Sequence, residues 1–433
     1  MPYRNPGRHR HEATIAVYNA AQPLDNEAPP VWKYPVPDRR SVLMITLPPQ
    51  VGGVGTMGAA AARALEEDGF SVTAAHRVAW SERPDLSVPA FQALWRRPRL
   101  ERWPDERVGL ERFGVGTWLP ECEWAHHLAW QPWRGLIERF PRHIVVTGNA
   151  LPGTALAQLG LPALNWVATD FLGDRIDRFR SKPLLRRVYD RLLNRPFCAI
   201  AERYALERTD VLALSDRTAA ALRQVTPKGR LRGVLRMPVE ATANAPRTGY
   251  GGAAPVIGFA GRLSDPRKNV PLLLDAFRRA RRDLPGLRLR VVGDLTQELA
   301  ISQGGGDLLD GIDFLPPLLP ADMPGFYESL DAFVISSHQE GLAIVGLEAM
   351  AAGLPVIATR CGGPEEYVID GETGRLSGFD GGEMAAAIAA ALSPSDYPRL
   401  SANALALVRE RYGWRQFRDL LLDRFHALHD GAR

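Results

Sequence analysis

Short apolar segments separated by helical patterns recur along most of the chain. Apolar runs bounded by turn residues are typical of buried strands, and apolar residues that recur every three or four positions are typical of helices. In the first half, strands are predicted at 41–47, 70–75, 143–147, 163–168 and 211–215. In the second half, they are predicted at 256–260, 287–292, 311–315, 332–335 and 356–359. This alternation predicts an α/β protein with two Rossmann-like domains, each built on a parallel sheet.

Breaks in the pattern suggest the domain boundaries. Residues 1–38 are rich in proline and polar groups, so we expect an extension there rather than part of a core. Residues 241–254 are small, polar and rich in glycine and proline, which is typical of a linker. We therefore predict a first domain at 39–240 and a second at 255–396. A C-terminal helical region follows at 397–433.

The stretch 80–135 differs from the rest of the first half. It holds seven of the ten tryptophans and many arginines, and its periodicity is weak. We expect irregular connections and short helices around a cleft. Arginine stacked on tryptophan as ordinary structural packing is the plainer interpretation.

Composition narrows the class of protein. Of 433 residues, 45% are hydrophobic, and the formal charge is only +4. That is enough apolar material for two cores, and too little positive charge to argue for nucleic acid. Three separated cysteines without a C-x-x-C pair disfavour a disulfide framework or a zinc site. With neither an apolar leader nor a bilayer-length apolar run, we expect a cytoplasmic protein.

One basic segment leaves membrane contact open. Residues 175–195 carry cations among apolar positions at helical spacing; the cations are Arg175, Arg178, Arg180, Lys182, Arg186, Arg187, Arg191 and Arg195. A helix of this kind can lie on the anionic inner face of a membrane as a peripheral contact. A solvated helix face is the alternative.

The second half opens with a candidate anion site. Arg262 and Lys268 fall in one loop between a strand that ends near residue 261 and a helix. Asn269 is predicted to cap that helix, and Pro271 suits its first turn. Open α/β sheets bind ligands at the carboxyl ends of their strands. A guanidinium and an ammonium there can together hold a diphosphate.

Two glutamates form the most informative pattern. Glu340 and Glu348 are separated by seven residues, and both come after the predicted strand at 332–335. Glu340 is predicted to lie at the start of the next helix, and Glu348 about two turns inside it. Free amides at that helix start, predicted at Gly341, Leu342, Ala343 and Ile344, suit a phosphate. Carboxylates beside them suit the hydroxyls of a sugar and a ribose. In the first half, Gly52 and Gly53 follow the first strand, and we expect a loop that approaches the same diphosphate.

These motifs resemble the retaining glycosyltransferases of family 4. The match comprises Gly261-Arg262-Leu263 with Lys268-Asn269, the two glutamates in E-G-L-A-I-V-G-L-E-A-M-A-A-G-L-P-V, G-G-P-E at 362–365, and D-G-E-T-G at 370–374. It covers residues 255–380 well, whereas 76–250 are similar only in the rhythm of strands and helices.

The resemblance implies the GT-B fold, with two Rossmann-like domains that face each other across a cleft. The first would bind an acceptor and the second a nucleotide-sugar. Arg262 and Lys268 would hold the diphosphate, Glu340 the sugar hydroxyls and Glu348 the ribose. One long last helix, with Trp414, would cross back onto the first domain. The resemblance also implies that neither a metal nor another cofactor is needed.

The implied reaction is transfer of a hexose-like sugar from a UDP- or GDP-sugar to an acceptor hydroxyl, with retention of configuration. The acceptor could be a carbohydrate, a lipid-linked molecule or a small molecule, in polysaccharide, glycolipid or natural-product synthesis. A departure concerns Asp170, which stands where many relatives place a histidine beside the reacting carbon. A catalytic contact and a structural role as helix cap are both open for Asp170.

Two other functions stay open. A nucleotide-sugar-binding partner subunit without activity would keep the same donor residues. An NAD(P)-dependent oxidoreductase would use Gly53-x-Gly55-x-x-Gly58, whose spacing fits. However, the second strand ends in His76-Arg77, without the acid that such enzymes place on the ribose.

Overall fold

The computed structural model describes residues 37–48, 52–103, 110–175, 184–294 and 310–431. All but the last two residues of the extension predicted at 1–38 lie outside these ranges, as do Arg178, Arg180 and Lys182. The described chain divides into two compact units. One comprises 1–212, 221–233 and 422–433, and the other 213–220 and 234–421.

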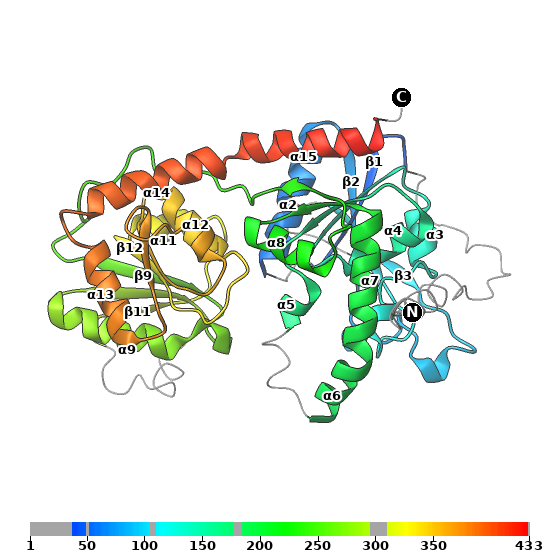
Figure 1. Cartoon of the computed structure of the whole chain (residues 1–433), viewed down its shortest axis with the longest axis horizontal. Helices are drawn as coiled ribbons and strands as arrows, with labels where there is room; N and C mark the ends of the chain where they lie inside the picture. The colour runs from blue at the N-terminus through cyan, green and yellow to red at the C-terminus, as the bar shows by residue number, and fades with distance from the viewer. Residues whose placement is uncertain (1–36, 49–51, 104–109, 176–183, 295–309, 432–433) are drawn as a thin grey trace, which may run out of the picture. The chain divides into compact units, whose positions relative to one another are not determined.

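The first unit is built around an eight-stranded sheet of order β3-β4-β2-β1-β5-β6-β7-β8 (Figure 1). Its strands are β1 (Ser41–Thr46), β2 (Ser71–Arg77), β3 (Leu100–Trp103), β4 (Glu111–Val115), β5 (Arg142–Thr147), β6 (Leu164–Val167), β7 (Asp210–Ala213) and β8 (Leu231–Val234). β1 pairs in parallel with β2 and β5, and β5 with β6. β1 is buried along its whole length, which explains its uninterrupted apolar sequence.

Helices and short turns connect these strands. They are α2 (Gly52–Glu67), η1 (Ala90–Gln92), η2 (Glu123–Ala125), α3 (Trp133–Ile137), η3 (Leu151–Gly153), α4 (Thr154–Leu159), α5 (Phe171–Arg175), α6 (Leu184–Tyr189), the π-helical η4 (Asp190–Asn194), α7 (Arg195–Arg208) and α8 (Asp216–Val225). None of the helices in the described ranges combines the length and apolar character needed to cross a bilayer.

The second unit holds a six-stranded sheet of order β11-β10-β9-β12-β13-β14, and all five pairs of neighbouring strands in it are parallel. The strands are β9 (Val256–Gly261), β10 (Arg288–Gly293), β11 (Ile312–Leu315), β12 (Ala332–Ile335), β13 (Val356–Thr359) and β14 (Gly374–Ser377). The helical elements are η5 (Pro266–Lys268), α9 (Val270–Asp283), α11 (Met323–Glu328), α12 (Ile344–Ala351), η7 (Pro364–Glu366), α13 (Gly381–Ala391) and α14 (Tyr397–Arg411). α15 (Trp414–His429) begins in this unit, and its residues from 422 belong to the first unit.

Helices cover both faces of the second sheet. α9 packs against α13 on one face, and α12 packs against α14 on the other (Figure 1). Leu273, Phe277 and Ile388 are buried together with strand residues such as Val291 and Val334. Two parallel-sheet α/β units confirm the fold class that the alternating pattern predicted.

The strand content and the last helix differ from the sequence-based expectations. β8 and β14 were not among the predicted strands. The region 80–135 contains two unpredicted strands, β3 and β4; they pair antiparallel, and β4 adds to β2 in parallel. β3 (L-E-R-W) and β4 (E-R-F-G-V) are short and contain charged residues, so the strand pattern is weak, although Phe113 and Val115 are buried. The predicted last helix is two helices, because α14 ends at Arg411 and α15 begins at Trp414. Gly413 lies in the break, and glycine is a poor helix former.

Candidate functional site

The loop after β9 is held by backbone contacts that leave its cation free. Asp294, just after β10, accepts hydrogen bonds from the amides of Leu263 and Ser264. Burial alone would raise the pKa of Asp294, but these bonds and one from the Ser264 hydroxyl lower it overall. Arg262 is exposed in this loop. Its carbonyl accepts a hydrogen bond from the Asp265 amide, whereas its guanidinium makes no hydrogen bond or ion pair with a described residue. It is therefore available for an anionic ligand.

Lys268 closes the same loop at the end of η5. Asp265 accepts a hydrogen bond from the Arg267 amide and so caps this short turn. Asn269, the predicted cap of α9, does occupy the N-cap position, but with φ 51° and without a side-chain capping bond. Pro271 lies in the first turn of α9, as predicted. The left-handed Asn269 turns the chain from η5 into α9.

The structure brings Lys268 and Glu340 together. The Lys268 ammonium donates to Glu340 Oε1 over 2.6 Å, and the Ser337 hydroxyl donates to the same oxygen over 2.6 Å. Both charged side chains are mostly buried, with 20% and 14% of their surface exposed. The Ser336 hydroxyl also holds the Lys268 carbonyl at 2.8 Å. Two loops that lie seventy residues apart in sequence thus form one charged site.

The N-terminus of α12 adds amide donors beside Glu340. The helix begins at Ile344, after Ala343 in the left-handed conformation (φ 58°). Within the described residues, no acceptor is recorded for the amides of Gly341, Leu342, Ala343 and Ile344. The Tyr367 hydroxyl donates to the Ala343 carbonyl over 2.8 Å and so fixes this turn. Free amides at a helix N-terminus favour a bound anion.

Glu348 lies in an environment of its own. It is one turn into α12, closer to the helix start than predicted, and it accepts a hydrogen bond of 2.6 Å from the Tyr327 hydroxyl. Removal from water raises the pKa of Glu348, and the Tyr327 bond lowers it in part. A partly buried carboxylate that accepts one hydrogen bond retains acceptor positions for further hydroxyl groups.

All of these groups lie at the reversal point of the second sheet. β9 is flanked by β10 on one side and by β12 on the other, so the connections leave in opposite directions. Arg262 follows β9, and Glu340 follows β12. Open α/β sheets bind ligands at this place, in the crevice beyond the carboxyl ends of the strands.

The predicted residues of the first unit have simpler local roles. Gly52 and Gly53 are not in a loop but form the first turn of α2, which begins at Gly52. Asp170 precedes α5, and its Oδ2 accepts a hydrogen bond of 2.8 Å from the Gly173 amide. Asp170 therefore caps a helix, the structural alternative considered from sequence. Whether these three residues also contact a ligand stays a prediction.

Several residues of the site had no assignment from sequence. Ser337 lies in the quoted motif, but its hydroxyl bond to Glu340 requires the turn after β12. Tyr327, on α11, is 21 residues before Glu348 and gives no local signal. Tyr367 is fully buried, and burial, followed by the nearby Glu340 charge, raises its pKa well above the usual range.

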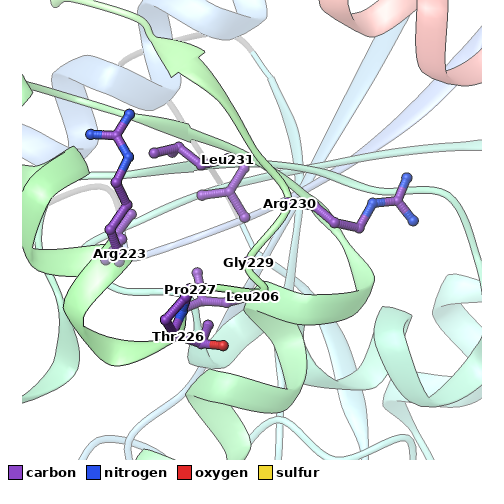
Figure 2. A pocket seen from close by; sticks show the side chains of 9 residues that line it. Leu206, Arg223, Thr226, Pro227, Gly229, Arg230 and Leu231 are labelled. Carbon is purple, nitrogen blue, oxygen red and sulfur yellow. The ribbon is translucent and has the colours of Figure 1, made fainter.

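A separate pocket of about 280 Å³ lies in the first unit (Figure 2). Leu206, Leu222 and Leu231 line it, at the end of α7, the end of α8 and the start of β8. Arg223 and Arg230 flank it but extend away from each other. Arg223, Thr226 and Arg230 are also among its lining residues, so the pocket is of mixed polarity, and none of its lining residues belongs to the charged site.

Comparison with known families identifies the second unit. Residues 254–394 match the family model described as Glycosyl transferases group 1. These residues form a group 1 glycosyltransferase domain. The match confirms the family that the sequence motifs suggested, and it contains the whole charged site. Among the described residues, no group of three or more His, Cys, Asp or Glu side chains could hold a metal ion.

Several relatives are named D-inositol 3-phosphate glycosyltransferase. The protein from Geodermatophilus obscurus is 37% identical over 168 residues, which cover 36% of this chain and 37% of the relative. That from Saccharomonospora viridis is 33% identical over 237 residues, covering 50% and 53%. The chain thus spans about half or less of the length of these two curated relatives.

Solved glycosyltransferase structures share the fold over most of the chain. Sucrose-phosphate synthase from Thermosynechococcus elongatus aligns with a TM-score of 0.68 at 18% identity, covering 91% of this chain and 100% of that chain. HepE from Anabaena, solved with UDP-glucose, aligns with a TM-score of 0.62 at 18% identity, covering 90% and 100%. At these identities the likeness shows the fold, of the GT-B class, beyond the domain matched by the family model.

Proposed function

We propose that the chain transfers a sugar from a nucleotide-diphosphate sugar to an acceptor hydroxyl. The observation that carries the proposal is the pairing of Lys268 with Glu340 beside the free amides of Gly341 to Ile344. Cationic and amide donors suit a diphosphate, and an adjacent carboxylate suits sugar hydroxyls. All of them lie within a group 1 glycosyltransferase domain.

Several side chains of the site are available to bind the nucleotide-sugar donor. An ammonium carries three donors, and Lys268 uses one on Glu340, so two are left for phosphate oxygens. Arg262 is exposed on the same loop and can add a bidentate contact. Glu348, with one bond from Tyr327, keeps acceptor capacity for the ribose hydroxyls. Gly52 and Gly53, in the first turn of α2, are proposed as a further contact to the donor.

The proposed chemistry stabilises the departing diphosphate. As the bond to the sugar breaks, negative charge grows on the phosphate oxygens, and Lys268, Arg262 and the amides before α12 are placed to stabilise it. Glu340 would orient the sugar through its hydroxyls. We propose attack from the same face as the leaving group, with retention of configuration and without a metal ion. Asp170 is proposed as a contact from the first unit.

The names of similar proteins set the order in which candidate donors and acceptors are tested. HepE was solved with UDP-glucose, so UDP-glucose comes first in a donor screen, followed by GDP-, ADP- and dTDP-sugars. Because several relatives are named D-inositol 3-phosphate glycosyltransferase, we propose D-inositol 3-phosphate as the first small-molecule acceptor to test. Carbohydrate and lipid-linked acceptors are tested beside it.

Thermal shift with nucleotide-sugars tests donor binding. A ligand that binds only the folded state at about 100 times its Kd stabilises it by about 2.7 kcal/mol, so a donor should raise Tm by several degrees. Glu348→Ala removes the proposed acceptor for the ribose hydroxyls. The variant should therefore need at least a tenfold higher ligand concentration to reach the same rise in Tm. If no nucleotide-sugar changes Tm at millimolar concentration, the proposal fails.

Turnover separates an enzyme from a binding protein. Lys268→Ala should lower the rate of sugar transfer by at least about a hundredfold, which is the scale for losing one donor that stabilises the developing charge. The rate of donor hydrolysis, measured without an acceptor, should fall by the same factor. Lys228→Ala is the matched control, since Lys228 is exposed in the first unit. Both assays are run with EDTA to test metal independence. Donor binding without any turnover would instead support the partner-subunit alternative.

A further inference from the structure

The first unit presents a row of exposed apolar side chains on α6 and η4. Leu184, Val188 and Leu192 are 73%, 47% and 67% exposed. Residues four apart lie on one side of a helix, so the three form a stripe. Figure 1 shows α6 at one end of the long helical rod that it forms with η4 and α7. A surface stripe of this kind is unusual for a helix that packs only on its own core.

A second exposed apolar group follows η1. Phe91, Leu94 and Trp95 are 67%, 88% and 67% exposed, within five consecutive positions. The tryptophan-rich region was expected to bury its rings against arginine. That packing occurs at Trp118, where the Arg97 guanidinium lies 5.3 Å from the ring centroid. Trp95 does not share it in the same way, because most of its surface is open to water.

Glu121 connects the two groups. Its carboxylate accepts a hydrogen bond of 2.7 Å from the Ala90 amide, at the start of η1. Its carbonyl accepts one of 3.2 Å from the hydroxyl of Tyr189, the last residue of α6. The segments that carry the two groups are therefore joined through Glu121. We name the two groups together the 91–192 surface: Phe91, Leu94, Trp95, Leu184, Val188 and Leu192.

The charge around α6 is positive. Arg186, Arg187 and Arg191 are exposed beside the stripe. The one acid within α6 and η4, Asp190, is fully buried and neutralised internally: its two oxygens accept from Arg175 and Arg195, each over 2.7 Å. Arg175 and Arg195, which the sequence placed among the candidate membrane cations, are thus structural. The remaining arginines give the outer surface its charge.

The same ion pairs make the base of the stripe rigid. Arg175 reaches Glu123 as well as Asp190, and Asn194 accepts a hydrogen bond of 3.2 Å from the Glu123 amide. α5, η2 and η4 are tied together by these contacts. The stripe is therefore displayed by a buttressed element, and its exposure is a property of the fold.

We propose that the 91–192 surface docks on an anionic lipid bilayer. Leucine, phenylalanine and tryptophan insert at the boundary of headgroups and acyl chains, while adjacent arginines attract anionic headgroups. The exposed apolar stripe and aromatic rings match the acyl chains of that partner, and the exposed arginines match its anionic headgroups. The inference goes beyond glycosyl transfer and needs no turnover to be tested.

Vesicle flotation tests the docking directly. The full chain is mixed with phosphatidylcholine vesicles that contain 30% phosphatidylglycerol, and with pure phosphatidylcholine vesicles as reference. We expect binding to the anionic vesicles that weakens at least tenfold between about 0.05 and 0.5 M salt, since surface charge is then screened. Leu184→Ser/Leu192→Ser and Phe91→Ser/Trp95→Ser should each weaken binding at least tenfold. Arg187→Gln/Arg191→Gln should reduce the preference for anionic lipid.

Leu319→Ser is the matched control, because Leu319 is 69% exposed in the second unit and should leave vesicle binding unchanged. Circular dichroism and Tm verify that each variant is folded, and nucleotide-sugar thermal shifts on the same samples report the donor site independently. Absence of wild-type binding, or equal binding by folded variants, would overturn the proposal. So would concentration-dependent dimerisation that Leu184→Ser/Leu192→Ser abolishes, since a second copy would then cover the surface.

Discussion

Buried carboxylates in this protein each have a defined set of donors, and Glu202 is the clearest case. It lies on α7 with 1% of its surface exposed, and it accepts a hydrogen bond of 2.8 Å from the Phe171 amide. Desolvation raises its pKa to about 8, although the Phe171 and Ala150 amides act in the opposite direction. Phe171 begins α5 directly after Asp170, so Glu202 positions the segment that presents Asp170.

Glu202→Gln should remove a pH-dependent loss of stability. The folded state of the wild type keeps a proton that the unfolded state has released, so the free energy of unfolding falls as pH rises from about 4.5 to about 8. Glutamine keeps the acceptor oxygen without the charge. The Tm of the variant minus the Tm of the wild type, measured by calorimetry, should be more than about 4 °C larger at pH 8 than at pH 5.

Glu207 on the same helix is the matched control with the opposite sign. Burial raises the pKa of Glu207, but bonds from Arg203 and Thr226 outweigh it and lower the pKa overall. Its stabilisation is present above the unfolded pKa and lost as pH falls, so Glu207→Gln should lose stability relative to wild type at neutral pH. A Glu202→Gln difference that does not change with pH would contradict the assignment.

At the scale of elements, the C-terminal part of α15, which belongs to the first unit from residue 422, is held in that unit by a histidine between two aspartates. His426 lies 2.8 Å from Asp68 and 2.7 Å from Asp430, and Arg142 reaches Asp430 over 2.8 Å. Phe425 meets Phe70 edge to face, with ring centroids 5.4 Å apart. The end of the chain is therefore held by both apolar and ionic contacts.

His426→Asn should weaken this attachment more at low pH than at high pH. The bonds to Asp430 and Asp68 raise the pKa of His426, while burial acts against them. The stabilisation is therefore complete below the unfolded value of 6.5 and is lost as pH rises through the folded pKa. We expect the variant and the wild type to differ in the stability of this attachment by only about 1 kcal/mol at pH 5.5, because the ion pairs are partly exposed. The difference should be smaller at pH 8.5. Hydrogen exchange on α15 measures it, and an equal difference at both pH values would refute the mechanism.

For the molecule as a whole, the segment 241–254, predicted to be a linker, makes specific contacts with the elements around it. Arg247 donates to the carbonyls of Tyr327 and Ala352, near the ends of α11 and α12, over 3.2 and 3.3 Å. The Arg247 amide also donates to the Ser401 hydroxyl over 2.8 Å. The segment is therefore bound along the second unit, to which it belongs.

Arg247→Ala should release this segment. The variant loses several charge-assisted bonds to carbonyls, which corresponds to about 1.5–3 kcal/mol for each bond that contributes fully. Hydrogen exchange at 241–254 should increase at least tenfold, with a lower Tm. Arg223→Ala, at the exposed Arg223 of the first unit, should change neither quantity. Fast exchange already in the wild type would show that the segment is a free linker after all.

The periodic parts of the fold could be read from the sequence because their cause is local. A buried parallel strand must be apolar throughout, and a helix that covers it must be apolar every third or fourth residue, so both sheets were predictable. The motif loops were predictable for the same reason: Gly261, Pro271 and Gly341 mark strand and helix ends. β3 and β4 were missed because their burial depends on β2, which is distant in sequence.

Partners across the fold were decided by tertiary structure alone. Sequence spacing could nominate Lys268 and Glu340, but it could not show that their side chains meet at 2.6 Å, that Tyr327 donates to Glu348, or that Glu202 holds the turn before α5. It also could not tell that Asp190 turns inward while Leu184 and Leu192 stay exposed. Backbone preference acts over a few residues, whereas burial and hydrogen bonding depend on which distant segments pack together, and that packing exists only in the folded chain.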